Sequence, residues 1–259
     1  RTCSPIPNPS AAGSGAACDA SPESANARPP ESMMLNRLHK WMRKRLGLRK
    51  PKRAHRNLKA RFSHVYRTRA WASEQSASGP GSDRTSGSVR QACIALNRVV
   101  LDHGIRSIAD APCGDFNWMP AFLSDHPDID YVGYDIVDEM IAANRAIHPE
   151  HRFVVLDITR RPPDQADLIF SKDMVNHLLE RDVWRALANM VRSGSTYLLI
   201  TSNDDPGPNA DIQENFGGLS RILNLRIAPY DFPPPLYDDG YLALWRIADL
   251  KFILDRGSI

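Results

Sequence analysis

The stretch SIADAPCGDFNWM, residues 107–119, decides the fold. A short apolar run reads as a strand and leads into a tight turn with an acid on each side, Asp110 and Asp115. Only Gly114 stands where a dinucleotide site would need the glycine-rich pattern G-x-G-x-x-G. The carboxylate of Asp115 would repel a phosphate, so we expect this turn to meet a cation or neutral hydroxyl groups.

Outward from this stretch, short apolar runs alternate with segments of helical periodicity. Residues 88–104 repeat apolar side chains at helical spacing, and Gly104 can end that helix. The runs are nearly continuous in apolar residues, which is typical of parallel strands buried on both faces. The sequence therefore predicts an α/β fold, a Rossmann-like, doubly wound, mostly parallel sheet. The expected strands are 107–111, 130–135, 152–157, 167–171, 196–201 and one within 240–252, and the expected helices between them are 116–126, 137–148 and 180–193.

Acids stand at or just after the carboxyl ends of the first four expected strands. In sheets of this kind, ligands bind beyond those ends, where the strand order reverses. One acid there is a common feature of turns and helix caps, but four in successive units indicate a ligand site. These acids are Asp110, Asp135, Asp157 and Asp173.

The charge of the chain is distributed unevenly. Residues 33–69 hold 14 Lys or Arg and no Asp or Glu, whereas residues 70–259 carry a net charge of −10. The first 32 residues are rich in Ser, Ala, Pro and Gly and lack the apolar core of a signal peptide. We expect a disordered or non-native leader at 1–32, with natural translation starting at Met33 or Met34, a basic amphipathic arm at 33–61 and a globular domain at 62–259.

The arm is expected to form a helix with one apolar face and one basic face. Such a helix suits an anionic membrane surface, which residues 33–56 would contact. Nucleic acid is the competing, less favoured partner, and a solvated tail or a helix packed on its own domain is the plain alternative. The apolar face consists of Leu35, Leu38, Trp41, Met42 and Leu46.

The four cysteines show no C-x-x-C pair and no His at ligand spacing. This favours a reduced intracellular chain without a zinc site. No apolar run reaches the length of about 18 residues that would span a membrane. We therefore expect a cytoplasmic protein, held peripherally at a membrane if the arm binds one.

The segment 62–235 resembles the class I S-adenosylmethionine (SAM)-dependent methyltransferases. It is most similar to a subgroup whose first motif is D-x-P-C-G-D-x-x-W-M, here residues 110–119. Four other motifs of that subgroup are present in the expected order. They are S-G-x-G-S at 78–82, Y-x-G-x-D-I at 131–136, a basic-Asp-x-x-x-His-Leu stretch at 172–178, and G-G-x-x-R-x-x-N-L at 217–225 before a Pro-rich turn.

The resemblance implies SAM as the cofactor and assigns roles around it. Asp135 should accept hydrogen bonds from both ribose hydroxyls, and Asp157 with Ile158 should meet the adenine. The turn from Asp110 to Gly114 should hold the methionine part, with an acid near its ammonium group. The full set of expected cofactor-binding residues is Asp110, Pro112, Cys113, Gly114, Trp118, Asp135, Ile136, Asp157, Ile158, Ser78, Gly79 and Ser82.

The sequence leaves two interpretations open for Trp118 and for the loop 78–82. Trp118 either covers the cofactor or is a core aromatic of the first helix. The loop 78–82 either closes over the methionine carboxylate or is a plain flexible loop. The usual sheet of the family ends in an antiparallel strand pair, but few residues follow 240–252. We therefore expect a shortened pair, with its second strand missing or displaced.

The expected base follows the fourth strand. Asp173 and His177 stand four residues apart and would share a face if a helix begins there. A His–Asp pair can deprotonate a sugar or other hydroxyl near neutral pH, as O-methylation requires. The alternative is that His177 caps or packs a helix. A Mg²⁺ ion held by this pair is a further alternative, which no set of three carboxylates at ligand spacing supports.

The methyl acceptor is expected on the long polar segment 202–235, with Arg221, Asn224 and Tyr230 as substrate-binding residues. Large apolar side chains for stacking are few there, which favours a small-molecule or glycan acceptor over a flat aromatic one. An RNA or protein methyltransferase docking through the arm is an alternative, although the acidic domain disfavours RNA. A non-catalytic SAM-binding module is another, which the presence of His177 disfavours.

Overall fold

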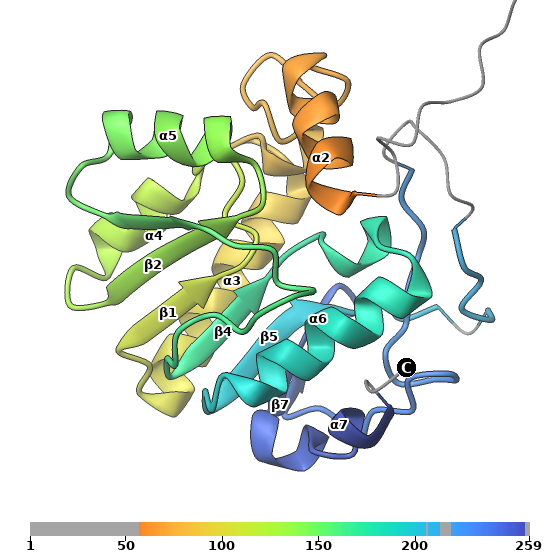
Figure 1. Ribbon diagram of the computed structural model, residues 1–259. Helices are drawn as coiled ribbons and strands as arrows, with labels where there is room; N and C mark the ends of the chain where they lie inside the picture. The colour runs from red at the N-terminus through yellow and green to blue at the C-terminus, as the bar shows by residue number, and fades with distance from the viewer. Residues whose placement is uncertain (1–56, 206, 213–218, 257–259) are drawn as a thin grey trace, which may run out of the picture. The chain divides into compact units, whose positions relative to one another are not determined.

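The computed structural model describes residues 57–205, 207–212 and 219–256 (Figure 1). In that part of the chain, a seven-stranded sheet has the order β3-β2-β1-β4-β5-β7-β6. The first five strands are parallel, and the β5–β7 and β6–β7 pairs are antiparallel. The strands are β1 (Ser107–Asp110), β2 (Asp130–Asp135), β3 (Arg152–Val155), β4 (Leu168–Ser171), β5 (Tyr197–Thr201), β6 (Tyr237–Asp238) and β7 (Leu242–Arg246). This order confirms the predicted Rossmann-like, mostly parallel fold.

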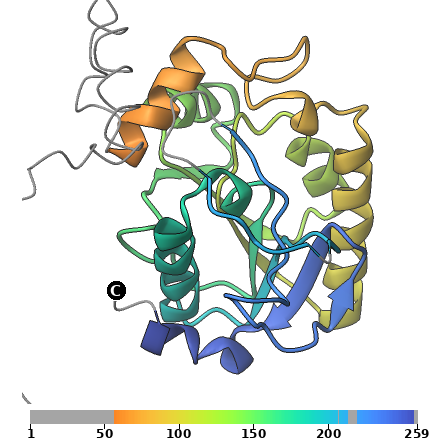
Figure 2. The same ribbon diagram turned by 90° about the vertical axis from the view of Figure 1, so that its right-hand side faces the viewer.

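Helices cover both faces of the sheet. On one face α3, α4 and α5 pack, and on the other α6 and α7. In the turned view α3 (yellow) and α6 (teal) stand on opposite sides of the strands (Figure 2). The helix bounds are α2 (Leu58–Arg67), α3 (Gly87–His103), α4 (Met119–Asp125), α5 (Asp138–Ile147), α6 (Glu180–Arg192) and α7 (Ile253–Arg256).

The helix α3 begins and ends at the residues that its sequence indicates. The hydroxyl of Ser86 accepts a hydrogen bond from the backbone N–H of Val89 at 3.1 Å and caps the amino end. At the carboxyl end Gly104 adopts φ +63°, the left-handed conformation that glycine takes without a Cβ clash. The expected helix over 88–104 is confirmed.

The C-terminal strand pair differs from the expectation in one respect. Its second member is β6, and it precedes β7 in the chain instead of following it. The pair is short, as expected, because β6 consists of Tyr237–Asp238 alone. Two residues carry no alternation of apolar and polar side chains, so the sequence offered no signal for this strand.

The expected boundary between residues 61 and 62 is wrong, because it falls inside α2, which spans Leu58–Arg67. Arg61 donates a hydrogen bond from Nη2 to the backbone carbonyl of His177 at 2.6 Å, so this helix belongs to the globular domain. The leader at 1–32 and the arm at 33–56 lie outside the described residues. No helix in the described ranges is long and apolar enough to cross a membrane.

Candidate active site

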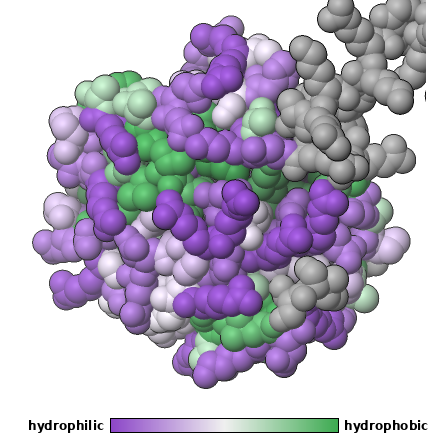
Figure 3. Space-filling view, viewed as in Figure 1, coloured by the Kyte–Doolittle hydropathy of each residue, from purple (hydrophilic) through white to green (hydrophobic). Residues whose placement is uncertain are grey.

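A cavity of about 630 Å³ lies at the carboxyl ends of β1, β2 and β4, where the strand order reverses. Helix α2 and the loop 78–82 also contribute to its walls. Apolar surface gathers below α5 and α2 on this face of the molecule (Figure 3). Every residue that the sequence assigned to the cofactor lines this cavity. These residues therefore share one cavity, and their role in binding the cofactor stays a prediction.

Asp110 at the end of β1 is a buried carboxylic acid, with 3% of its surface exposed. Its Oδ2 accepts a hydrogen bond from the hydroxyl of Tyr131 at 2.7 Å. Its Oδ1 has no hydrogen-bond partner among the described residues. Burial raises the pKa of Asp110 to about 8. An unpaired oxygen of this kind in a cavity wall suits a cationic ligand group, which would offset the cost of its ionisation.

The second acid of the turn, Asp115, has a different role, which the sequence did not reveal. Its Oδ2 accepts hydrogen bonds from the hydroxyl of Ser76 at 2.9 Å and the backbone N–H of Ala77 at 2.6 Å. Its own N–H donates to Ser78 Oγ at 2.9 Å. A Cβ at Gly114 would meet the same Oγ at 2.5 Å, so only glycine allows this approach. The loop before α3 is tied to the turn and is not a plain flexible loop.

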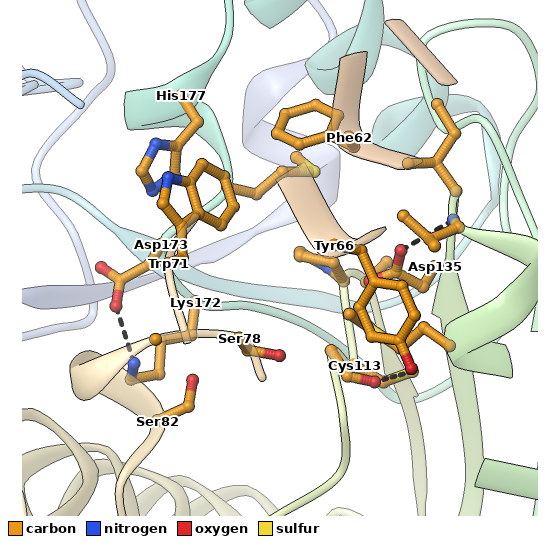
Figure 4. A pocket seen from close by; sticks show the side chains of 18 of the residues that line it. Phe62, Tyr66, Trp71, Ser78, Ser82, Cys113, Asp135, Lys172, Asp173 and His177 are labelled. Carbon is orange, nitrogen blue, oxygen red and sulfur yellow. Dashed lines mark hydrogen bonds and ion pairs between the residues drawn. The ribbon is translucent and has the colours of Figure 1, made fainter. Parts of the chain in front are cut away.

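Asp135 ends β2 on the opposite side of the cavity from His177 (Figure 4). Its Oδ1 accepts a hydrogen bond from the backbone N–H of Val137 at 2.9 Å. Burial raises the pKa of Asp135 to about 6, against the effect of the backbone donors, which lower it. The carboxylate of Asp157 is engaged by Thr159, whose hydroxyl lies 2.6 Å from Asp157 Oδ1.

Trp118 combines the two roles that the sequence left open. Its indole is nearly buried and packs edge-on against Phe170, with ring centroids 6.0 Å apart. It also lines the cavity. Trp118 is a core aromatic that forms part of the cavity wall.

Asp173 and His177 line the same cavity, but they do not stand on an α-helix. Asp173 has φ +53°, and the segment Val175–His177 is a 3₁₀ helix, so the expected i, i+4 geometry is wrong. The structure brings the two residues to one wall by a sharp turn instead. No group of three His, Cys, Asp or Glu side chains that could hold a metal ion occurs within the described ranges.

Two neighbours hold the carboxylate of Asp173. Its Oδ2 accepts from Lys172 Nζ at 2.7 Å and from the hydroxyl of Tyr241 at 2.6 Å. Burial alone would raise the pKa of Asp173, but the charge and hydrogen bond of Lys172, the Tyr241 hydroxyl and the charge of His177 bring it below its usual value. Asp173 is therefore a carboxylate at neutral pH.

The ring of His177 is fixed by two contacts. Its Nδ1 lies 3.2 Å from the backbone carbonyl of Leu219. A carbonyl only accepts hydrogen bonds, so Nδ1 carries the proton of the neutral ring and Nε2 carries the lone pair. The ring also packs against the indole of Trp71, with centroids 4.6 Å apart (Figure 4).

The three expected substrate-binding residues lie elsewhere, outside the set that lines the cavity. Tyr230 is 1% exposed and packs against Trp184 in the core. Asn224 is buried and donates to the carbonyl of Asp205 at 3.0 Å. Arg221 pairs with Asp211 at 2.5 Å. These three side chains are held within the domain away from the cavity lining, so the expectation that they face an acceptor is corrected.

Aromatic side chains that the sequence did not assign to the site form its other wall. Phe62 and Tyr66 come from α2, and Trp71 follows that helix. Phe62 meets Trp71 edge-on, with ring centroids 5.8 Å apart. The expectation of few stacking side chains concerned the segment 202–235 alone, and these aromatic residues come from outside it. Nothing in the sequence indicated that they would pack beside this cavity.

The sequence of residues 108–194 matches the profile of a family described as a methyltransferase domain. The matched part runs from β1 through α6 and contains Asp110, Asp135, Asp173 and His177. No curated protein matches the chain.

Solved structures of similar fold include CalS10, an amino pentose methyltransferase from Micromonospora echinaspora. The two sequences are 19% identical, and the TM-score is 0.41. The match covers 48% of this chain and 54% of CalS10. The chain thus spans about half the length of CalS10. The PH0226 protein from Pyrococcus horikoshii OT3 has 14% identity and a TM-score of 0.45, over 63% of this chain and 93% of that one. The strand order shows a Rossmann-like, mostly parallel fold independently of these distant likenesses.

Proposed function

We propose that the chain is a SAM-dependent methyltransferase that transfers a methyl group to a hydroxyl of a small, glycan-like acceptor. One observation carries the proposal. Asp110, whose Oδ1 has no hydrogen-bond partner among the described residues, and Asp135 line one cavity at the point where the strand order reverses. The methyltransferase profile matched by residues 108–194 supports the same assignment.

The donor atoms of the cavity fit the groups of SAM. Asp110 offers Oδ1 to the ammonium group, whose charge would favour the ionised carboxylate. Asp135 offers its carboxylate to the ribose hydroxyls at the end of β2, and the apolar side chains of Leu156 and Ile158 line the cavity for the adenine. When bound, SAM supplies an electrophilic methyl group. The cavity residues hold the cofactor and the acceptor in line for the displacement.

His177 is the base in this proposal. Its Nε2 holds the lone pair that takes the proton of the acceptor hydroxyl. The charge of His177 contributes to the low pKa of Asp173, so by reciprocity the Asp173 carboxylate stabilises the protonated imidazole. Asp173 thus assists through its charge, while its hydrogen bonds go to Lys172 and Tyr241.

The cavity wall beside His177 favours an acceptor with both a polar edge and an apolar face. Phe62 and Trp71 present aromatic rings, and Asn176 and Ser220 add polar groups. A sugar ring has this composition, because its hydroxyls lie at the edge and its C–H groups on the faces. Aromatic side chains pack well against such apolar faces.

The alternative of a nucleic-acid or protein substrate docked through basic residues receives less support. Two basic side chains of α2 are already paired within the domain. Lys59 contacts Asp138 at 2.7 Å, and Arg67 is paired with Glu139. Acidic residues of α5 therefore partly neutralise the positive charge of α2.

The substitution His177→Gln tests the catalytic assignment. We expect S-adenosylhomocysteine to bind as tightly as to the wild type in calorimetry, and methyl transfer to hydroxylated acceptors to fall by about 100-fold or more. His103→Gln is the matched control, because His103 packs on Tyr197 and is not among the cavity residues. Unchanged turnover in His177→Gln would remove His177 from the mechanism.

A further inference from the structure

We infer that Lys172 and Tyr241 are positioning residues that latch the loop 78–82 in the cavity wall, Lys172 by direct contact and Tyr241 through Asp173. The term latch denotes these three side chains. The inference rests on the proposed function, since it names residues that shape the proposed cofactor site. It also gives Asp173 a role that its sequence position did not suggest.

The latch is a continuous chain of hydrogen bonds across three distant segments. Lys172 Nζ donates to the backbone carbonyl of Gly81 at 2.8 Å and to Asp173 Oδ2 at 2.7 Å. The hydroxyl of Tyr241 donates to the same oxygen at 2.6 Å. Figure 4 shows Lys172 reaching Asp173 beside Ser82. The loop before α3, the end of β4 and the start of β7 are joined in this way.

Burial and charge make these bonds mutually dependent. The side chain of Lys172 is 6% exposed and that of Asp173 30%. A buried ammonium group needs a carboxylate beside it, and removing either partner leaves an uncompensated charge. Burial and the Asp173 carboxylate raise the pKa of Tyr241, so its hydroxyl remains a donor at all physiological pH values.

The backbone of Tyr241 is itself held by two hydrogen bonds. Its carbonyl accepts from the N–H of Ser202 at 2.9 Å, and its N–H donates to Asp239 Oδ1 at 3.0 Å. Tyr241 is not among the residues that line the cavity, whereas Lys172 and Asp173 are. The Tyr241 hydroxyl therefore acts on the cavity indirectly, through the Asp173 carboxylate that it contacts.

The latch and Asp115 together hold the loop 78–82 and the segment before it in place. The segment before the loop is tied by Asp115 to Ser76 and Ala77. At Gly81 the carbonyl accepts from Lys172 and also from the hydroxyl of Ser88 at 2.9 Å. The loop is thus ordered before a ligand arrives, and binding does not have to include the entropic cost of ordering it.

Tyr241→Phe is the decisive variant, because it removes one hydroxyl from outside the cavity. We expect the affinity for S-adenosylhomocysteine to fall about tenfold, as the loss of a hydrogen bond to a charged group predicts. KM for SAM should rise by the same factor while kcat stays within about twofold. Hydrogen exchange of the loop 78–82 in the full, unliganded chain should become faster.

Tyr197→Phe is the matched control. Tyr197 begins β5, and its ring packs against that of His103 with centroids 4.8 Å apart, at the opposite end of the strands from the latch. We expect its affinity, KM and loop exchange to equal those of the wild type. If Tyr241→Phe proves unfolded by circular dichroism, Lys172→Met provides the same loop-exchange measurement.

The outcomes separate the latch from the proposed function. If the wild type binds S-adenosylhomocysteine and Tyr241→Phe shows wild-type affinity and loop exchange, the latch is refuted and the function stands. If the wild type fails to bind, the proposed function is refuted. Loop exchange in Tyr241→Phe still decides whether the three side chains hold the loop, because that measurement needs no ligand.

Discussion

The two acids of the turn after β1 show how a single residue's surroundings decide its chemistry. Asp115 is satisfied by donors from the preceding loop, so its role is to hold that loop. Asp110 keeps one oxygen without a partner in the described part of the chain, and its pKa is raised to about 8. A buried carboxyl oxygen without a partner destabilises the folded protein, and such groups are expected where a bound ligand offsets this effect.

Asp110→Asn should therefore stabilise the protein while it weakens cofactor binding. The folded state holds the Asp110 proton up to about pH 8, whereas the unfolded chain releases it near 3.8. The wild type thus loses stability as pH rises between these values, and the amide does not. Denaturant unfolding should show that the variant gains stability over the wild type and that this gain is larger at pH 8 than at pH 5. A variant less stable than the wild type at pH 8 would contradict this reading.

Asp135 gives a second prediction, on the pH dependence of binding. Its pKa of about 6 means that it gains a proton as pH falls below that value. A protonated carboxyl accepts hydrogen bonds from ribose hydroxyls less well than a carboxylate. Affinity for S-adenosylhomocysteine should fall as pH decreases from 7 to 5 in calorimetric titrations. The Asp135→Asn variant should bind weakly, with a flatter profile in this range, and an equally steep profile would exclude Asp135 as the source.

At the scale of elements, a glycine at each end of α3 allows a paired test of backbone conformation. Gly104 lies at its C-cap with φ +63°, and Gly87 is its first residue. A Cβ would meet no atom within 4 Å at either position. The two substitutions therefore differ only in backbone conformation.

Gly104→Ala should lower the free energy of unfolding by about 1 kcal/mol, because alanine is strained in the left-handed region. Gly87→Ala should raise it by up to about 1 kcal/mol, because alanine is the better helix former. Urea denaturation of both variants measures the two signs. Equal effects of the two substitutions would contradict the left-handed conformation of Gly104 at the end of α3.

At the scale of the whole molecule, the uneven charge gives a prediction for the arm. The arm at 33–56 holds 10 basic residues and no acidic ones, and it is joined to residues 57–259, whose net charge is −6. We propose that the arm binds anionic membranes, as its sequence pattern predicts. The full chain should bind anionic vesicles in sedimentation assays and lose that binding at high salt. It should not bind neutral vesicles. A chain that starts at residue 57 should not bind, and equal binding by both would exclude the arm.

The sheet and its cofactor end were predictable from the sequence because their signals are local. Apolar runs mark strands buried on both faces, and the acids at their ends follow from strand direction alone. The acceptor wall was not predictable in this way. Phe62 and Trp71 reach it from a segment far from the acids in the sequence, and Tyr230 is buried although it belongs to the long polar segment 202–235. These placements depend on tertiary packing, which periodicity does not report.

The measurement that tests the central claim most directly is calorimetric titration of the full chain with SAM and S-adenosylhomocysteine, repeated on Asp135→Ala. The account predicts micromolar binding by the wild type and its loss in the variant, because the carboxylate at the end of β2 holds the ribose. Circular dichroism establishes that both proteins are folded. A folded wild type that binds neither compound, or a variant that binds as tightly as the wild type, would contradict the account.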